Sequence, residues 1–170
     1  MPISINLSAL QLKDAALVPT LRQALAASAV SPAQMELELT ESLFMDNVGA
    51  TILVLNRIKA LGCSLSIDDF GTGYSSLNYL HRFPIDKLKI DRSFIQNIHL
   101  APENLAVTKA IIGLGHTLDL EVVAEGVERA LDVQVLQEAG CDELQGFHLV
   151  RPTPADAFGA WLLGHHAELT

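Results

Sequence analysis

The sequence has few aromatic residues, few charged residues and only two cysteines. Aromatic residues make up 5% and charged residues 18% of the 170 residues, whereas 49% are apolar. A core must therefore be built from Leu, Ile, Val and Ala. This apolar share is typical of a globular domain and excludes a disordered chain. Because 170 residues leave little room for two cores, we expect one domain.

Basic residues are also scarce, and their scarcity restricts the partners. There are 11 Lys and Arg residues against 20 Asp and Glu, which gives a net charge of −9. Long nucleic acid is bound through clustered Lys and Arg, so we expect no such partner. A small phosphate ester remains compatible, because bound metal ions supply positive charge.

No targeting or membrane signal is visible in the sequence. No apolar run reaches the roughly 18 residues that a membrane span needs, and no signal-peptide pattern is present. Cys63 and Cys141 lack metal-ligand spacing and are interpreted as buried free thiols. Free thiols are typical of a reducing compartment, and we expect a cytoplasmic protein.

Six short runs have the composition of β-strands, and segments with helical periodicity separate them. The strands are expected over Ile3–Leu7, Met35–Leu39, Ser64–Ile67, Lys87–Ile90, Glu121–Ala124 and Glu143–Gln145. Helices are expected over Ala16–Ala27, Asn47–Leu61, Glu103–Gly113, Arg129–Ala139 and Pro154–Leu163. Alternation of strands and helices predicts βα units and a parallel sheet.

The residues at the strand ends distinguish a doubly wound parallel sheet from a (β/α) barrel. A doubly wound sheet usually carries a Gly-rich phosphate loop, and the segment around Gly71 and Gly73 does not match one. A (β/α) barrel instead places its chemistry at the C-terminal ends of many strands. We therefore predict an α/β, TIM-like (β/α) barrel that is incomplete, with about six of the usual eight βα units.

Each predicted strand ends near a carboxylate, an amide or a lysine. These residues are Asn6, Glu38, Asp68, Asp69, Lys89, Glu125 and Gln145, and Glu41, Asp91 and Glu128 follow closely. In a parallel barrel they would share one mouth. Neighbouring carboxylates repel one another unless cations neutralise them, and their oxygens suit Mg²⁺ or Mn²⁺. The lack of a His/Cys cluster argues against zinc.

This set of residue types is suited to phosphoryl chemistry. Adjacent Asp68 and Asp69 are placed to bridge two metal ions, an arrangement that activates water and holds a phosphate for displacement. Lys89 would stabilise charge on the phosphate or hold the attacking water.

A purely structural explanation exists for each position taken alone. A single acidic residue at a strand end is more often a helix N-cap or a solvated loop residue, and Asp91 in the segment DRSF is the best example. Thr40, Glu41 and Ser42 are likewise compatible with simple turn chemistry. Because all six strand ends carry such a residue, we favour a functional site.

The motifs that contain these residues resemble those of EAL-type cyclic di-GMP phosphodiesterase domains. The resemblance covers nearly the whole chain, and the third and fourth motifs are highly specific. In chain order the motifs are NLSA (6–9), ELTES (38–42), DDFGTGYSSLNYL (68–80), LKIDRSFI (88–95), VAEGVE (123–128) and QGFHLVRP (145–152).

The resemblance implies a barrel that hydrolyses cyclic di-GMP to linear pGpG with two Mg²⁺ or Mn²⁺ ions. It implies Lys89 and Gln145 beside the water, and Glu41 as the residue that orders the loop after the Asp pair. It implies substrate contacts by Asp91, Glu128 and Phe147, where Tyr is common in the family. The implied metal ligands are Asn6, Glu38, Asp68, Asp69 and Glu125, and the last is also counted among the catalytic residues.

The resemblance also indicates that residues 1–170 are the C-terminal part of a single EAL-type domain, without the segment that carries the EAL motif. We expect a fragment, although a natural short form or a sheet completed by another chain is an alternative. The parent protein would add N-terminal sensory or GGDEF domains and form a homodimer. We expect weak or no turnover from this chain alone, and the alternatives are a non-catalytic cyclic di-GMP-binding module or a dimerisation module.

Overall fold

A parallel six-stranded sheet forms the centre of the computed structural model, which describes residues 2–41, 43, 48–73 and 80–165. The strands follow one another in sequence order, and each pairs with the next. Their bounds are β1 Ile3–Leu7, β2 Met35–Thr40, β3 Ser64–Phe70, β4 Lys87–Ile90, β5 Glu121–Ala124 and β6 Glu143–Leu144. The six predicted strands are therefore confirmed, although β2 and β3 are longer and β6 is shorter than expected.

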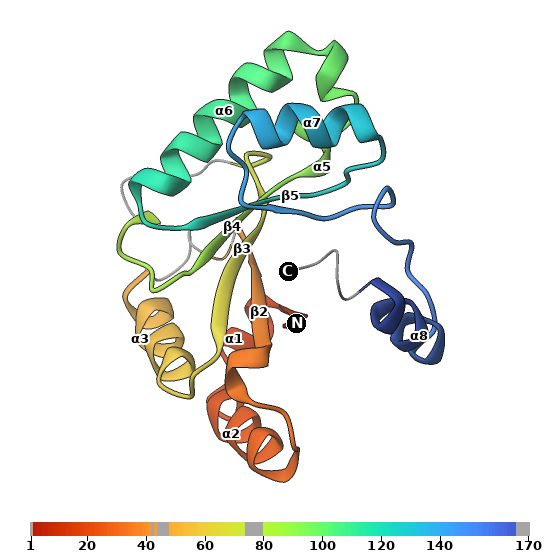
Figure 1. The fold of residues 1–170 in the computed structure, drawn as a ribbon. Coiled ribbons are helices and arrows are strands. Elements are labelled where there is room, and N and C mark those ends of the chain that lie inside the picture. The colour runs from red at the N-terminus through yellow and green to blue at the C-terminus, as the bar shows by residue number, and fades with distance from the viewer. Residues whose placement is uncertain (1, 42, 44–47, 74–79, 166–170) are drawn as a thin grey trace.

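Helices alternate with the strands, as expected for βα units. The α-helices are α1 Ala9–Leu12, α2 Leu17–Ala27, α3 Val48–Lys59, α5 Arg92–Ile95, α6 Pro102–Thr117, α7 Ala130–Glu138 and α8 Ala155–His165, and η1 Pro32–Gln34 and η3 Ile98–Leu100 are short 3₁₀ helices. In Figure 1, α6 and α7 lie beside β5, whereas α2 and α3 lie near β2 and β3. Within the described residues, no helix is long and apolar enough to span a membrane.

Some of the expected motifs fall partly outside the described residues. This applies to position 42 of the second motif, positions 74–79 of the third, and the expected helix start at 47. The helix α1 was not expected. It begins with a capping box, in which the Ser8 hydroxyl accepts from the Gln11 backbone N–H and the Gln11 side chain accepts from the Ser8 N–H.

The two faces of the sheet differ in polarity. On the helix-covered face, Leu37, Leu39, Leu65, Ile67, Leu88, Ile90, Val122 and Ala124 are fully or almost fully buried. Each such Leu or Ile contributes about 1.5–3 kcal/mol through burial. On the opposite, inner face the alternate residues Glu36, Glu38, Ser66, Lys87 and Lys89 are also buried. Strand alternation therefore separates a hydrophobic core from a charged interior.

Two similar contacts fix the beginnings of strands. The Asp86 carboxylate accepts a 2.8 Å hydrogen bond from Leu65 N–H of β3 and binds Lys59 Nζ at 2.6 Å. The Asp142 carboxylate accepts a 2.7 Å bond from Val122 N–H of β5 and lies 2.9 Å from His116 Nε2. Burial raises the pKa of Asp142, but the Val122 N–H and His116 outweigh it, so that pKa lies below its ordinary value. These contacts fix the strand ends that lie opposite the polar mouth.

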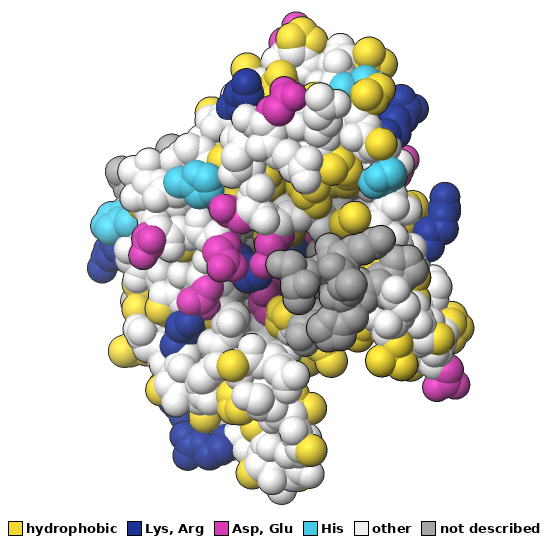
Figure 2. Space-filling model, in the orientation of Figure 1, with side chains coloured by type: hydrophobic (Ala, Val, Ile, Leu, Met, Phe, Trp, Pro, Cys, Tyr) yellow, Lys and Arg dark blue, Asp and Glu magenta, His cyan; other side chains and the backbone are white. Residues whose placement is uncertain are grey.

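Acidic side chains dominate parts of the surface, in keeping with the composition. Figure 2 shows Asp and Glu side chains gathered around basic atoms near the middle of one face.

Gly146 allows the segment after β6 to pack directly on the segment after β5. A Cβ at this position would lie 2.2 Å from the Val127 carbonyl oxygen and 2.3 Å from its nitrogen. The same two segments are joined by a 3.0 Å hydrogen bond from Val127 N–H to the Gln145 carbonyl. The absence of a side chain at Gly146 therefore sets the approach of two segments that carry predicted site residues.

We predict that Gly146→Ala destabilises the protein by about 1–3 kcal/mol, because the new methyl meets backbone atoms that cannot move independently. Gly113→Ala in α6 is the matched control, since nothing lies within 4 Å of its Cβ position. That control should be neutral or stabilising by up to about 1 kcal/mol, owing to the higher helix propensity of Ala. Urea unfolding of both variants measures the difference, and equal effects would contradict the packing argument.

Candidate functional site

Lys89 lies at the centre of the candidate site, surrounded by carboxylates from three other strands or strand ends. Its Nζ is 2.6 Å from Glu38 Oε1, 2.5 Å from Glu125 Oε1 and 3.7 Å from Asp68 Oδ1. The side chains of Lys89 and Glu38 are 4% and 8% exposed, so this pair is nearly dry. The predicted convergence of strand ends is therefore observed for these four residues.

A break in the pairing of β3 brings Asp68 and Asp69 to the same place. Successive strand residues normally point to opposite faces. The register between β3 and β4 shifts between Ile67 and Phe70, and Asp69 has a positive φ of 53°. A bulge of this kind redirects side chains next to a site. It explains how two adjacent carboxylates can face the same ligand.

Burial and neighbouring charges raise the pKa of two carboxylates of this cluster. Burial raises the pKa of Glu125, and Asp68 and Glu38 raise it further against the lowering effect of Lys89. Burial and the neighbours Asp68 and Asp91 also raise the pKa of Asp69. The pKa of Lys89 is raised too, because its bonds to Glu125 and Glu38 outweigh the cost of burial. The lysine therefore stays charged and stabilises an excess of negative charge.

The donor set fits a divalent cation. Asp68, Asp69 and Glu125 each offer a carboxylate oxygen, and these oxygens all lie within 4.8 Å of one another. Hard oxygen ligands of this type suit Mg²⁺, Mn²⁺ or Ca²⁺. Glu38 lies on the other side of Lys89, and its register partner on β1 is Asn6. Asn6 makes no side-chain contact with the cluster among the described residues.

Glu41 lies apart from the cluster and binds the loop after β3. Its Oε2 accepts hydrogen bonds from the backbone N–H groups of Gly71, at 3.2 Å, and Gly73, at 3.3 Å. The residue is only 8% exposed. This contact agrees with the expected role of Glu41 in ordering the loop that follows the two aspartates.

Asp91 has the structural role that its sequence suggested and a second contact as well. It is the N-cap of α5, and its side chain accepts a 2.9 Å hydrogen bond from Ser93 N–H. Burial raises the pKa of Asp91, but its bonds from Ser93, Asp69 and Arg92 lower it below the ordinary value. The contact with Asp69 connects this cap to the cluster, and no local sequence pattern predicted it.

Gln145 and Phe147 follow β6 at the edge of the described sheet. The backbone N–H of Gln145 donates a 2.8 Å hydrogen bond to the Ala124 carbonyl, which places it one strand from Glu125. Phe147 is 49% exposed, and the Arg151 guanidinium lies 4.9 Å from its ring centre. Within the part of the chain that is described, no hydrogen bond joins the Gln145 side chain to the Lys89 cluster, and the ring contact of Phe147 is with Arg151.

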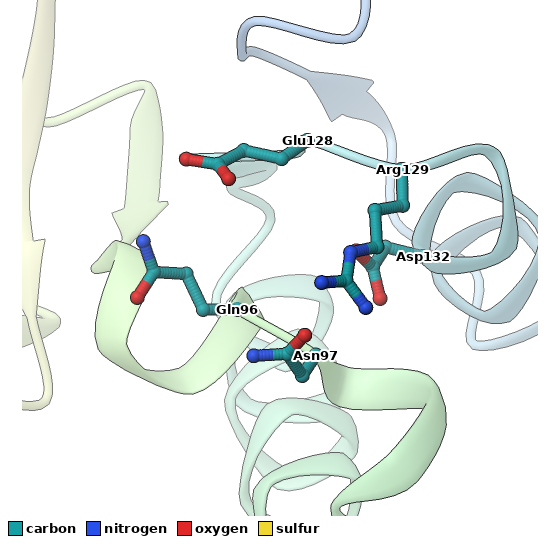
Figure 3. A pocket seen from close by; sticks show the side chains of 5 residues that line it. All are labelled: Gln96, Asn97, Glu128, Arg129 and Asp132. Atoms are coloured by element: carbon teal, nitrogen blue, oxygen red, sulfur yellow. The ribbon is translucent and has the colours of Figure 1, made fainter.

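Glu128 borders a polar pocket of about 250 Å³ that the sequence did not predict. Figure 3 shows Glu128 and Gln96 on one side of it, Arg129 and Asp132 on the other, and Asn97 between them. Asp132 is 2% exposed and pairs with His99 Nδ1 at 2.6 Å. The pocket lies between the segments that follow β4 and β5, and these are distant in sequence. No local pattern could have joined them.

The fold and site thus define a class: a parallel (β/α) protein with an acidic, lysine-centred site built from strand ends. Comparison with known proteins assigns the family. The EAL domain family model matches residues 1–152, so the chain belongs to the EAL domain family.

Relatives and solved structures support this assignment. MucR of Pseudomonas aeruginosa, a bifunctional diguanylate cyclase/cyclic di-GMP phosphodiesterase, is 47% identical over 91% of this chain and 22% of its own length. The structure of the MucR phosphodiesterase with c-di-GMP has a TM-score of 0.87 at 46% identity, covering 92% of this chain and 64% of that one. Klebsiella pneumoniae BlrP1, in a manganese and c-di-GMP complex, has a TM-score of 0.81 at 34% identity, covering 89% of this chain and 39% of that one. The incomplete TIM-like barrel is therefore confirmed.

We predict that Lys89→Met lowers stability by about 3–5 kcal/mol, because it leaves buried carboxylates without their cation. Lys59→Met is the control, since Lys59 and Asp86 form an ion pair whose side chains are 33% and 37% exposed. That variant should lose at most about 1 kcal/mol. Urea unfolding in the presence of a chelator measures both, and similar losses would show that the Lys89 cluster is not a buried charge centre.

Proposed function

We propose that this chain forms the metal-binding and catalytic part of a cyclic di-GMP phosphodiesterase that produces linear pGpG. The observation that carries this proposal is the position of Lys89 among Glu38, Asp68 and Glu125, with Asp69 beside them. Membership of the EAL domain family directs the choice of substrate. Similar proteins named as cyclic di-GMP phosphodiesterases support it, among them NbdA of Pseudomonas aeruginosa and PdeR of Escherichia coli.

The proposed metal ligands are the oxygen donors at one end of the sheet. They are Asn6, Glu38, Asp68, Asp69 and Glu125, and we propose two Mg²⁺ or Mn²⁺ ions. The calcium and manganese complexes of BlrP1 are compatible with such ions in a similar fold. Bound divalent ions would lower the pKa of a water molecule and neutralise charge on the phosphate.

The chain's own residues would orient the reactants. The Lys89 ammonium has three N–H donors, two of which reach Glu38 and Glu125, so it can direct a third toward water or a phosphate oxygen. The water oxygen would bond to phosphorus while one ribose–phosphate P–O bond breaks, and the leaving oxygen would take a proton. Gln145 would hold the water or a metal ligand in position.

Four further residues would act around this centre. Glu41 would keep the loop after β3 in place through Gly71 and Gly73. Asp91 and Glu128 would contact the substrate from the side of β4 and β5, and Glu128 already faces a polar pocket. Phe147, with its half-exposed ring, would offer a stacking surface for a guanine base.

The chain spans about a fifth of the length of the curated relatives that it matches. The activity and partners of a whole protein are therefore proposals. We propose upstream sensory or GGDEF domains, a homodimer and a cytoplasmic location.

A second candidate function is binding of cyclic di-GMP without turnover, or a role in dimerisation alone. It is favoured by the exposed side chain of Asn6, a proposed metal ligand that forms no hydrogen bond with the Lys89 cluster among the described residues. An incomplete ligand set would bind less precisely, and catalysis depends more on precise positioning than binding does.

We predict weak or no Mn²⁺-dependent hydrolysis of cyclic di-GMP by this chain, and clear hydrolysis by a longer form that continues N-terminally through an EAL motif. Asp68→Asn in the longer form should lower kcat at least about 100-fold, because even residues behind metal ligands contribute on that scale. Glu103→Gln is the control, since Glu103 lies in the first turn of α6 away from the site. Separation of cyclic di-GMP from pGpG by chromatography gives the rates.

The outcomes distinguish the candidates. Binding of cyclic di-GMP without hydrolysis by either form would support the binding module and contradict the enzyme. Equal rates from both forms would show that the described site suffices. If Asp68→Asn and Glu103→Gln were equally active, the proposed metal ligands would be wrong.

A further inference from the structure

A second charged layer lies on the inner face of the sheet, directly beneath the candidate site. Residues two apart on a strand point to the same face. Four strands carry a polar residue two positions before a predicted site residue: Ser4 before Asn6, Glu36 before Glu38, Ser66 before Asp68 and Lys87 before Lys89. Glu143 precedes Gln145 in the same way. The inner layers of TIM barrels are usually filled by branched apolar side chains, so this polarity needs an explanation.

Lys87 is the centre of this lower layer and joins four strands. Its Nζ lies 2.6 Å from Glu143 Oε1, 3.1 Å from Glu121 Oε2 and 3.8 Å from Glu36 Oε2. The Lys87 side chain is 11% exposed, and Glu36 is 5% exposed. The bonds to Glu143 and Glu121 outweigh burial and raise the pKa of Lys87. The Lys87 ammonium therefore links β2, β4, β5 and β6 on the inner face.

The contact with Glu143 matters most, because it adds a side-chain bond to β4 where backbone hydrogen bonds hold β6 only to β5 and to the segment after β5. This strand has only two residues, Glu143–Leu144, and among the described strands it pairs with β5 alone. The Lys87–Glu143 bond reaches across β5 and fixes β6 relative to β4. Gln145 comes two residues after Glu143, so the rotation of β6 that satisfies Lys87 also sets the direction of the Gln145 side chain.

On β4, the lysine of the lower layer lies next to the lysine of the upper layer. Lys87 and Lys89 are neighbours on the same face of β4, and both bind carboxylates of β2 and of β5 or its end. Within the lower layer, the Ser66 hydroxyl is fully buried, and it has no hydrogen-bond partner among the described residues. On β2 and β4 no apolar residue separates the two layers, so these strands would transmit a shift of the lower ion pairs to the site, whereas on β5 the buried Val123 lies between Glu121 and Glu125.

We propose that Lys87 is a positioning residue for the reaction, and that it acts through Glu143 on Gln145. This inference rests on the proposed function for its kinetic readout, but not for its binding readout. In this role Lys87 does not touch the substrate. It holds β6 in the register and rotation that bring the Gln145 side chain to the water and the metal ligands.

The test uses Lys87→Met, Glu143→Gln and Gln145→Ala in the longer active form, with Lys87→Arg as the conservative variant. Lys87→Met and Glu143→Gln should each lower kcat roughly 10- to 100-fold, the scale of a small misplacement, with KM changed less than about twofold. Lys87→Arg should recover most of the rate. Glu143→Gln is included because the Glu143 side chain is 51% exposed, so its neutralisation leaves no buried charge unpaired.

A double-mutant cycle separates positioning from a general loss of stability. If Lys87 acts through Gln145, Lys87→Met combined with Gln145→Ala should be no slower than Gln145→Ala alone. Additive losses would overturn the proposal. Lys59→Met is the control at the same end of the strands: it removes a comparable ion pair with Asp86 outside the inner face and should leave kcat unchanged. A similar loss in Lys59→Met would also overturn it.

Mn²⁺ affinity, measured by electron paramagnetic resonance on this 170-residue chain, gives a readout that does not need turnover. Lys87→Met and Gln145→Ala should weaken Mn²⁺ binding by similar factors, and their combination should be no weaker. If this pattern holds while no form hydrolyses cyclic di-GMP, the proposed function fails and the positioning role stands. If Lys87→Met binds Mn²⁺ as the wild type does and keeps its rate, the positioning role is wrong.

Discussion

The charge of Lys89 is the constraint on which the rest of the structure depends. Four carboxylates, from Glu38, Asp68, Asp69 and Glu125, converge on a small region at the ends of three strands. Without a cation, such a cluster would be relieved only by protonation or by movement of the strands. The lysine lies on the central strand β4, where it reaches carboxylates on both sides. The sheet can therefore hold an acidic site before any metal arrives.

This arrangement explains why the two faces of the sheet differ so sharply. A sheet with a charged interior gains little from hydrophobic burial on that side, so stability must come from the helix-covered face. That face is filled with fully buried Leu, Ile and Val from β2 to β5. Burial of a charged group is costly unless it is paired, and the structure meets this condition with Lys87 and Lys89, one for each inner layer. Stability and chemistry are thus assigned to opposite faces of the same strands.

Most of the fold could be predicted from sequence because its signals are local. Period-two alternation in segments such as Met35–Thr40 and Lys87–Ile90 marks strands, and helical periodicity marks α6. The N-cap at Asp91 was visible for the same reason. The convergence of Glu38, Asp68, Lys89 and Glu125 followed from one assumption, that parallel strands place their C-terminal ends together. Local pattern and simple topology were sufficient for these features.

The remaining features depend on contacts between distant segments, which no local pattern encodes. The pocket beside Glu128 needs residues from both sides of α6. The lower charged layer was equally hidden, because Glu36, Lys87 and Glu143 each look like an ordinary solvated strand residue when read alone. Only the side-chain contacts of Lys87 in the folded sheet show that they face one another. The C-terminal end of β6 could not be predicted either. Gln145, the last residue of the predicted strand, is held by a backbone hydrogen bond to Ala124 of β5, and its own composition does not encode that bond.

The bulge at Asp68 and Asp69 is a local backbone distortion that lets both carboxylates face the site. A regular strand would send one of the two carboxylates into the apolar layer beneath the helices, where a charge is strongly disfavoured. The left-handed backbone at Asp69 costs about 1–3 kcal/mol for a residue with a side chain. That cost is smaller than the cost of a buried, unpaired carboxylate, and Asp is among the residues that tolerate this conformation best. The distortion is also supported on both sides, by the Glu41 carboxylate that accepts from Gly71 N–H and by the Asp68 carboxylate that accepts from Asp69 N–H. Strain at this point is therefore best understood as the condition that lets two consecutive acids serve one site.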